Sequence, residues 1–90
     1  MLVEKIEYTK GFYKQIAKLP DKKREKVYAT IDVFAKNPLT RSLRLHQLKG
    51  EFANLYSISA GGDLRLHFEF ILVGNVARFV AVGTHAQLYK

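Results

Sequence analysis

Three histidines, His46, His67 and His85, lie in the second half of this 90-residue chain and offer acid–base chemistry. Histidine is the side chain whose charge changes near neutral pH without help from its surroundings. Two histidines suit RNA cleavage, in which one group takes the proton of the ribose 2′-hydroxyl and another protonates the departing 5′-oxygen. The attacking oxygen belongs to the substrate, so no metal ion is needed, and DNA, which lacks that hydroxyl, is spared. We expect His46 and His85 to share the proton transfers, in an order that the sequence leaves open.

Charged side chains near the histidines could complete this chemistry. Charge that builds on the phosphate oxygens must be met by cations, and the guanidinium of Arg65 is suited to that task. Alternatively, Arg65 forms a surface ion pair with Glu69, although exposed pairs contribute only about 0–1 kcal/mol. Asp63 is either an acceptor that serves a histidine or a turn residue after Gly61-Gly62. His67 either lines the site as a substrate contact or has a cross-strand structural role.

Other chemistries find less support in the sequence. The chain has no cysteine, which excludes disulfides and thiolate metal sites. No two histidines stand three or four residues apart, the spacing common in zinc sites. Neither a glycine-rich phosphate loop nor a G-x-S-x-G nucleophile motif is present. We therefore expect no metal ion and no cofactor.

The balance of charge favours a polyanionic partner. Fifteen Lys and Arg oppose eight Asp and Glu, which gives a formal net charge of +7 and an isoelectric point near 9.8. Nucleic acid, an anionic membrane surface or an acidic protein would fit, although net charges of up to about 8 are ordinary for a small domain. No apolar run approaches the roughly 20 residues of a membrane span, and the first residues lack the features of a signal peptide. We expect a cytoplasmic protein that does not enter a membrane.

Hydrophobic periodicity predicts a single α+β domain over residues 1–90. Phe12, Ile16 and Leu19 fall on one face of a helix that Thr9 caps and Pro20 ends. The predicted order is strand, helix, helix and three strands: strand 3–8 near a sheet edge, helices 10–19 and 22–36, a loop or short strand over 39–50, strands 55–59, 64–70 and 76–82, and a short tail over 86–90.

The two helices are expected to form a hairpin on one face of a small antiparallel sheet, which leaves the opposite face free for a site. Asp21 is predicted to cap the second helix. Its apolar stripe comprises Val27, Ile31, Phe34 and Ala35. In strand 64–70 the even-numbered side chains face the core, and the odd-numbered ones, Arg65 among them, face the opposite side.

Three motifs, taken in order, resemble those of a known family. They are L-H-x-L-K-G at Leu45–Gly50, D-x-R at Asp63–Arg65 and G-T-H-x-x-L-Y at Gly83–Tyr89. At this spacing, in a basic chain of this length, they resemble the RelE superfamily of toxins and are closest to its YafQ-like branch. The resemblance covers nearly the whole chain, because the amino-terminal strand and helical hairpin are similar too.

The resemblance implies a RelE/ParE-like fold and a toxin of a type II toxin–antitoxin system. Such toxins cleave messenger RNA, usually in the ribosomal A site, and leave a cyclic phosphate and a 5′-hydroxyl; a cognate antitoxin wraps and neutralises them. By resemblance His46 is catalytic or contacts phosphate, Asp63 is the acidic catalytic residue and His85 is the general acid. Arg65 would contact phosphate, and Tyr89 would stack on or orient a base.

Two further cations, Arg44 and Lys49, are candidates for phosphate contacts, because some relatives use Lys and Arg in place of histidines. The basic helices are expected to contact ribosomal RNA electrostatically. The chain departs from the YafQ-like pattern at Ser59, where relatives often carry a histidine, and His67 does not replace that histidine in register. This departure puts the full catalytic set in question.

Two other functions fit the sequence. One is a ParE-like toxin that inhibits DNA gyrase and is not a nuclease, and the other is a non-catalytic RNA-binding module. The combination of His46, Asp63 and His85 favours the nuclease over the gyrase inhibitor, because gyrase binding needs no proton-transfer pair. A binding module would keep its effect after alanine replaced His85.

Overall fold

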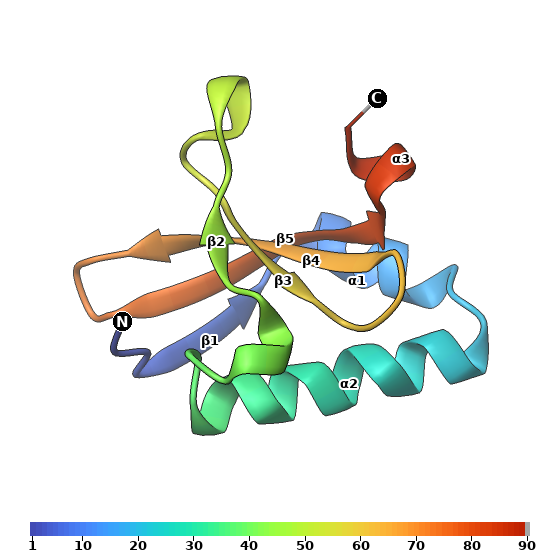
Figure 1. Ribbon diagram of the computed structural model, residues 1–90, viewed down its shortest axis with the longest axis horizontal. Helices are drawn as coiled ribbons and strands as arrows, with labels where there is room; N and C mark the ends of the chain where they lie inside the picture. The colour runs from blue at the N-terminus through green and yellow to red at the C-terminus, as the bar shows by residue number, and fades with distance from the viewer. Residues whose placement is uncertain (90) are drawn as a thin grey trace.

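The computed structural model describes residues 1–89 and confirms the predicted order of helices and strands. In chain order the elements are β1 (Lys5–Tyr8), α1 (Lys10–Ala17), α2 (Asp21–Lys36), the 3₁₀ turn η1 (Arg41–Leu43), β2 (His46–Gln47), the 3₁₀ turn η2 (Gly50–Phe52), β3 (Tyr56–Ser59), β4 (Leu64–Ile71), β5 (Val76–Thr84) and α3 (His85–Leu88) (Figure 1). The tail expected after the last strand is instead the short helix α3. No helix in the described part of the chain is long and apolar enough to cross a membrane.

The five strands form one sheet in the order β1-β5-β4-β3-β2. Neighbours among β2, β3, β4 and β5 are antiparallel, whereas β1 runs parallel to β5. The sheet is therefore mixed, which corrects the expectation of a wholly antiparallel one. The helical hairpin carries the chain from the β1 edge to the β2 edge (Figure 1), so β1 pairs with the last strand rather than with the next one.

Helices α1 and α2 lie on one face of the sheet, as predicted (Figure 1). Thr9 caps α1, since its hydroxyl accepts a hydrogen bond from the Phe12 N–H at 3.2 Å. Asp21 is not the cap of α2; Pro20 holds that position, and Asp21 is the first helical residue, where a negative charge suits the helix dipole. Ala35 is exposed, so the buried stripe of α2 is narrower than expected.

Four phenylalanines form the centre of the core between helices and sheet. Phe12 on α1, Phe34 on α2, Phe68 on β4 and Phe79 on β5 are all fully buried. Their contacting rings have centroids 5.0–5.7 Å apart, a spacing that favours aromatic pairs. Truncating such a ring to alanine typically costs about 3–5 kcal/mol. This packed block holds β4 and β5, whose other face carries polar side chains.

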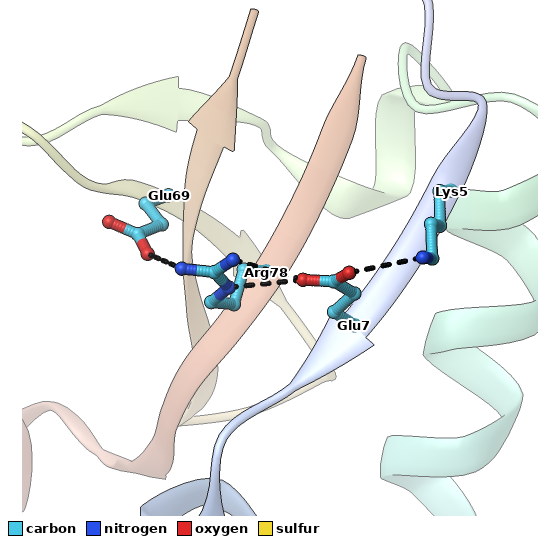
Figure 2. A network of polar contacts seen from close by, with 4 residues as sticks. All are labelled: Lys5, Glu7, Glu69 and Arg78. Atoms are coloured by element: carbon cyan, nitrogen blue, oxygen red, sulfur yellow. Dashed lines mark hydrogen bonds and ion pairs between the residues drawn. The ribbon is translucent and has the colours of Figure 1, made fainter. Parts of the chain in front are cut away.

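A network of ion pairs crosses three strands on the face away from the helices (Figure 2). Arg78 on β5 contacts Glu7 on β1 and Glu69 on β4, each at 3.1 Å, and Lys5 pairs with Glu7 at 3.3 Å. Arg78 and Lys5 hold the pKa of Glu7 below its ordinary value. Because Glu69 pairs with Arg78, the alternative pairing of Glu69 with Arg65 is wrong.

Candidate active site

Strand pairing places His46, Ser57 and His67 in one row across the sheet. His46 on β2 lies opposite Ser57 on β3, and Ser57 lies opposite His67 on β4. Directly opposed residues project to the same face of a sheet. Leu66 and Phe68, the neighbours of His67 on β4, fill the core, so the row faces away from the helices.

The short helix α3 leads to Tyr89, which covers His67. The Tyr89 hydroxyl is 3.2 Å from Nε2 of His67, and the two rings have centroids 5.4 Å apart. The ring of His85 lies 4.4 Å from that of Tyr89, and Phe52 of η2 meets Tyr89 edge-on at 5.4 Å. We call Phe52, His67, His85 and Tyr89 the aromatic cluster. It joins α3 to the η2 loop, which rises from the same side of the sheet (Figure 1).

His67 is buried within this cluster and is only 2% exposed. Burial lowers the pKa of its imidazole below the usual 6.5, and the nearby His46 and His85 lower it further. The side chain is therefore neutral at neutral pH. Burial and the contact with Tyr89 favour the cross-strand structural role for His67, and its role as a substrate contact stays a prediction.

His46 and His85 are both exposed, so solvent and a bound molecule can reach their rings. Nδ1 of His46 is 2.8 Å from the carbonyl oxygen of Arg44. A carbonyl only accepts, so Nδ1 donates and Nε2 of the neutral ring carries the free lone pair. Arg44 has a φ of +51° where η1 ends, and this left-handed turn sets its carbonyl beside the ring. His46 is thus prepared to accept a proton at Nε2.

Arg65 lies on the open face but turns back toward the β3–β4 turn. Its Nη1 donates to Ser59 Oγ at 3.2 Å, to the Gly62 carbonyl at 2.8 Å and to the Leu64 carbonyl at 3.0 Å. Ser59 therefore helps to hold the arginine in place. The guanidinium is near enough to Tyr89 to oppose the effect of burial, which raises the pKa of that phenol.

Asp63 follows the β3–β4 turn, and its neighbour Leu64 pairs with Thr84, which precedes His85. Asp63 is exposed after the glycine turn and borders a hollow with Lys23, Lys26 and Thr84. Within residues 1–89, no hydrogen bond or ion pair joins Asp63 to a histidine, although Thr84 directly precedes His85 in the chain. The structure therefore brings His46, His67 and His85 near one another and leaves Asp63 at the edge of the site.

Arg44 and Lys49 are exposed on the segment around β2. Lys49 immediately precedes η2, so it lies next to the turn that supplies Phe52 to the aromatic cluster. Sequence reasoning missed Phe52, because a lone aromatic in an irregular loop has no periodic pattern. It also missed Gln87, although Thr84 followed three residues later by Gln is the signature of a helix capping box.

No cluster that could hold a metal ion occurs among the described residues. The aromatic cluster provides a stacking surface, and the exposed His46 and His85 beside it could transfer protons. Phosphate binding would be electrostatic, through Arg65, Arg44 and Lys49.

Solved structures of toxins share this fold. YafQ from E. coli strain BL21(DE3) aligns with a TM-score of 0.77 and 24% identity over 97% of this chain and 100% of that chain. The E. coli DinJ–YafQ toxin–antitoxin complex gives 0.75 and 23% over 99% and 100%. The YoeB/ParE toxin from Agrobacterium tumefaciens gives 0.74 and 16% over 91% and 99%. No protein-family model and no curated protein matches the chain. The RelE/ParE-like fold that the motifs implied is thereby confirmed.

Proposed function

We propose that this chain is the toxin of a type II toxin–antitoxin system and cleaves messenger RNA on the translating ribosome. The observation that carries the proposal is the pair of exposed histidines, His46 and His85, both close enough to buried His67 to lower its pKa. They share the open face of the sheet with an anchored arginine and a tyrosine. The fold is that of YafQ and of the YoeB/ParE toxin, which supports the same reading.

In the proposed reaction His46 is the general base and His85 is the general acid. Nε2 of His46 accepts the proton of a ribose 2′-hydroxyl, and the 2′-oxygen forms a bond to the adjacent phosphorus. The bond from phosphorus to the 5′-oxygen breaks, and protonated His85 gives a proton to that leaving oxygen. The products are a 2′,3′-cyclic phosphate and a 5′-hydroxyl. Each proton-transfer group contributes about 10²–10⁴-fold to such rates.

Cations and the aromatic cluster hold the substrate in this scheme. Nη1 anchors Arg65. In this scheme the other guanidinium nitrogens, Nη2 and Nε, bind a phosphate. Arg44 and Lys49 add charge along the same path, and Tyr89 stacks on a base. Asp63 is the acidic residue of this scheme. It lies at the edge of the site beside Thr84, the residue that precedes His85.

We further propose that the protein acts in the cytoplasm and has a cognate antitoxin as its partner. An apolar groove between α1 and α2 fits one segment of that antitoxin. It is lined by Tyr8, Phe12, Tyr13, Ile16, Tyr28, Ile31 and Asp32. Tyr13 and Tyr28 remain 59% and 53% exposed there.

The charge of the helices specifies the chemistry of the segment that fills this groove. α1 carries two lysines and no acid, and α2 carries five basic and three acidic residues. An amphipathic helix with an apolar stripe and an acidic rim complements both features. Replacing Tyr28 with Lys should weaken binding of the purified antitoxin at least tenfold; unchanged affinity would place the segment elsewhere.

The function is tested by inducing the wild type and His85→Ala in growing bacteria and mapping messenger-RNA ends. A matched control is Glu25→Ala, an exposed residue of α2 outside the site. We expect growth arrest and new cuts within translated codons for the wild type and the control, and neither for His85→Ala. Arrest with intact RNA and altered DNA supercoiling would instead indicate a gyrase inhibitor. RNA binding without cuts would indicate a binding module.

A further inference from the structure

Helix α3 is too short to be stable alone, yet it carries His85 and leads directly to Tyr89. It spans only His85–Leu88, a single turn, and isolated helices need about 12–15 residues to persist in water. Something outside its own backbone must therefore hold it against the sheet. The contacts at its first residues supply this support.

A reciprocal pair of hydrogen bonds closes the start of α3. Gln87 Oε1 accepts from the Thr84 N–H at 2.8 Å, and Thr84 Oγ1 accepts from the Gln87 N–H at 3.3 Å. The side chain of Gln87 reaches back over the end of β5 to make the first of these bonds. Gln87 itself is exposed, so its conformation is not fixed by burial in the core.

Gly83 provides the space that Gln87 occupies. A Cβ at position 83 would lie 2.9 Å from Oε1 of Gln87, 3.4 Å from its Cβ and 3.6 Å from Cδ2 of Leu88. The first distance is shorter than real contacts allow. Gly83 lies in the strand without a positive φ, so its backbone alone does not require glycine. A Cβ there would push Oε1, the mobile end of the exposed Gln87 side chain, away from the Thr84 N–H that donates to it.

We propose that Gly83 and Gln87 are positioning residues, which latch α3 to the end of β5 and thereby set His85 and Tyr89 over His67. This inference rests on the proposed ribonuclease function for its catalytic consequence. The structural part of the inference does not depend on that function, because the latch also determines whether Tyr89 covers His67. A misplacement of about 1 Å in a reacting group can cost on the order of 100-fold in rate.

His67 reports on the latch in a way that does not depend on activity. It is buried under Tyr89, and it faces His46 on β2, His85 and Tyr89 around α3, and Arg65 on its own strand. Burial is the largest cause of its lowered pKa. If α3 detaches, water reaches the imidazole and its pKa rises toward 6.5.

The test compares Gly83→Ala and Gln87→Ala with Gly11→Ala in the full chain. Gly11 is the matched control, because a Cβ there meets nothing closer than 3.8 Å. Gln87→Glu is the conservative variant, since glutamate also completes a capping box. The readouts are the NMR titration of His67 and the kcat/KM for RNA cleavage.

We expect both latch variants to raise the His67 pKa and to lower kcat/KM by about 10- to 100-fold. Gly11→Ala should keep the wild-type His67 titration, and Gln87→Glu should keep more of the wild-type kcat/KM than Gln87→Ala. Gln87→Ala alters only an exposed side chain, so it remains informative if Gly83→Ala does not fold. An unchanged His67 titration in Gln87→Ala would overturn the inference. If the wild type cuts no RNA, the proposed function fails, and the His67 titration alone still supports or overturns the latch.

Discussion

The histidines divide by exposure, and exposure decides what each one can do. His67 is sealed under Tyr89 and neutral, whereas His46 and His85 meet solvent at the same site. His46 has its tautomer set by the Arg44 carbonyl, which leaves Nε2 as an acceptor. The proposed assignment of His46 as base, which the sequence left open, rests on this single backbone contact.

The lowered pKa of His67 makes stability depend on pH. Between the folded pKa and the unfolded value of 6.5, the unfolded chain binds more protons, so stability falls as pH drops through that window. We expect unfolding by urea to require less denaturant at pH 5.5 than at pH 7.5. His67→Phe, which cannot titrate, should show a smaller difference. A difference as large as in the wild type would assign the effect to other groups.

Tyr89 has one observed contact, from its hydroxyl to His67, and one proposed role, stacking on a base. Tyr89→Ala removes both and should lower kcat/KM by about 10- to 100-fold, because stacking on an aromatic is worth about 1–3 kcal/mol per base. Tyr89→Phe keeps the ring and loses only the 3.2 Å contact to His67, so a smaller loss is expected. Steady-state cleavage kinetics distinguish the two. Equal losses would mean that the hydroxyl, not the ring, carries the function.

The sequence located these residues better than it described their surroundings. Spacing and residue type selected His46, Arg65 and His85, which meet on one face. Burial of His67 could not be read from its strand, because the cover comes from Tyr89, 22 positions later in the chain. The role of Ser59 as an acceptor for Arg65 depends on the register of β3 with β4, which no local pattern encodes.

Among the elements, β1 shows how an edge strand is held by side chains as well as by its backbone. Its parallel ladder with β5 spans Lys5–Tyr8 only. The network of Glu7, Arg78 and Glu69 ties β1, β5 and β4 together across their open face (Figure 2). Because these side chains are a third or more exposed, water weakens each pair.

We therefore expect Arg78→Met to change the pKa of Glu7 more clearly than it changes the free energy of unfolding. The hydrogen bond from Arg78 is the largest cause of the lowered pKa of Glu7, so the variant should raise that pKa toward 4.5. It should also weaken the loss of stability on acidification below that pH, since Glu7 then differs less between folded and unfolded states. NMR titration of the Glu7 carboxyl checks this. An unmoved pKa would mean that Lys5 alone sets it.

Element types followed from periodicity, but their partners did not. The helical hairpin and the strands from β3 to β5 have patterns of period 3.6 and 2, which burial of one face imposes. The parallel pairing of β1 depends on the edge of the sheet to which the hairpin leads the chain. The shift in register between His67 and Phe68 leaves Val80 of β5 without a paired residue on β4, and no local pattern indicates it. Helix α3 was missed because one turn has no period, only a capping box.

At the scale of the whole molecule, the net charge of +7 predicts binding that depends on salt. If Arg44, Lys49 and Arg65 each neutralise a phosphate, raising salt fourfold should weaken binding of a single-stranded RNA roughly 20-fold, from a slope of about −0.7 per contact. The slope should fall by about 0.7 in Lys49→Ala. Lys36→Ala, at the end of α2, is the control. These binding titrations use the His85→Ala background. A salt slope near zero would contradict the proposed phosphate contacts.

In the proposed reaction, the 2′-hydroxyl of messenger RNA is the nucleophile, and His46 and His85 transfer the protons. The most direct measurement adds purified protein to ribosomes stalled on a defined message, with either a normal ribose or a single 2′-deoxyribose at the cut position. We expect a 2′,3′-cyclic phosphate and a 5′-hydroxyl from the first message, no cut in the second, and no cut of either by His46→Ala or His85→Ala. Cleavage of the deoxy-substituted message at an undiminished rate would contradict the proposed reaction.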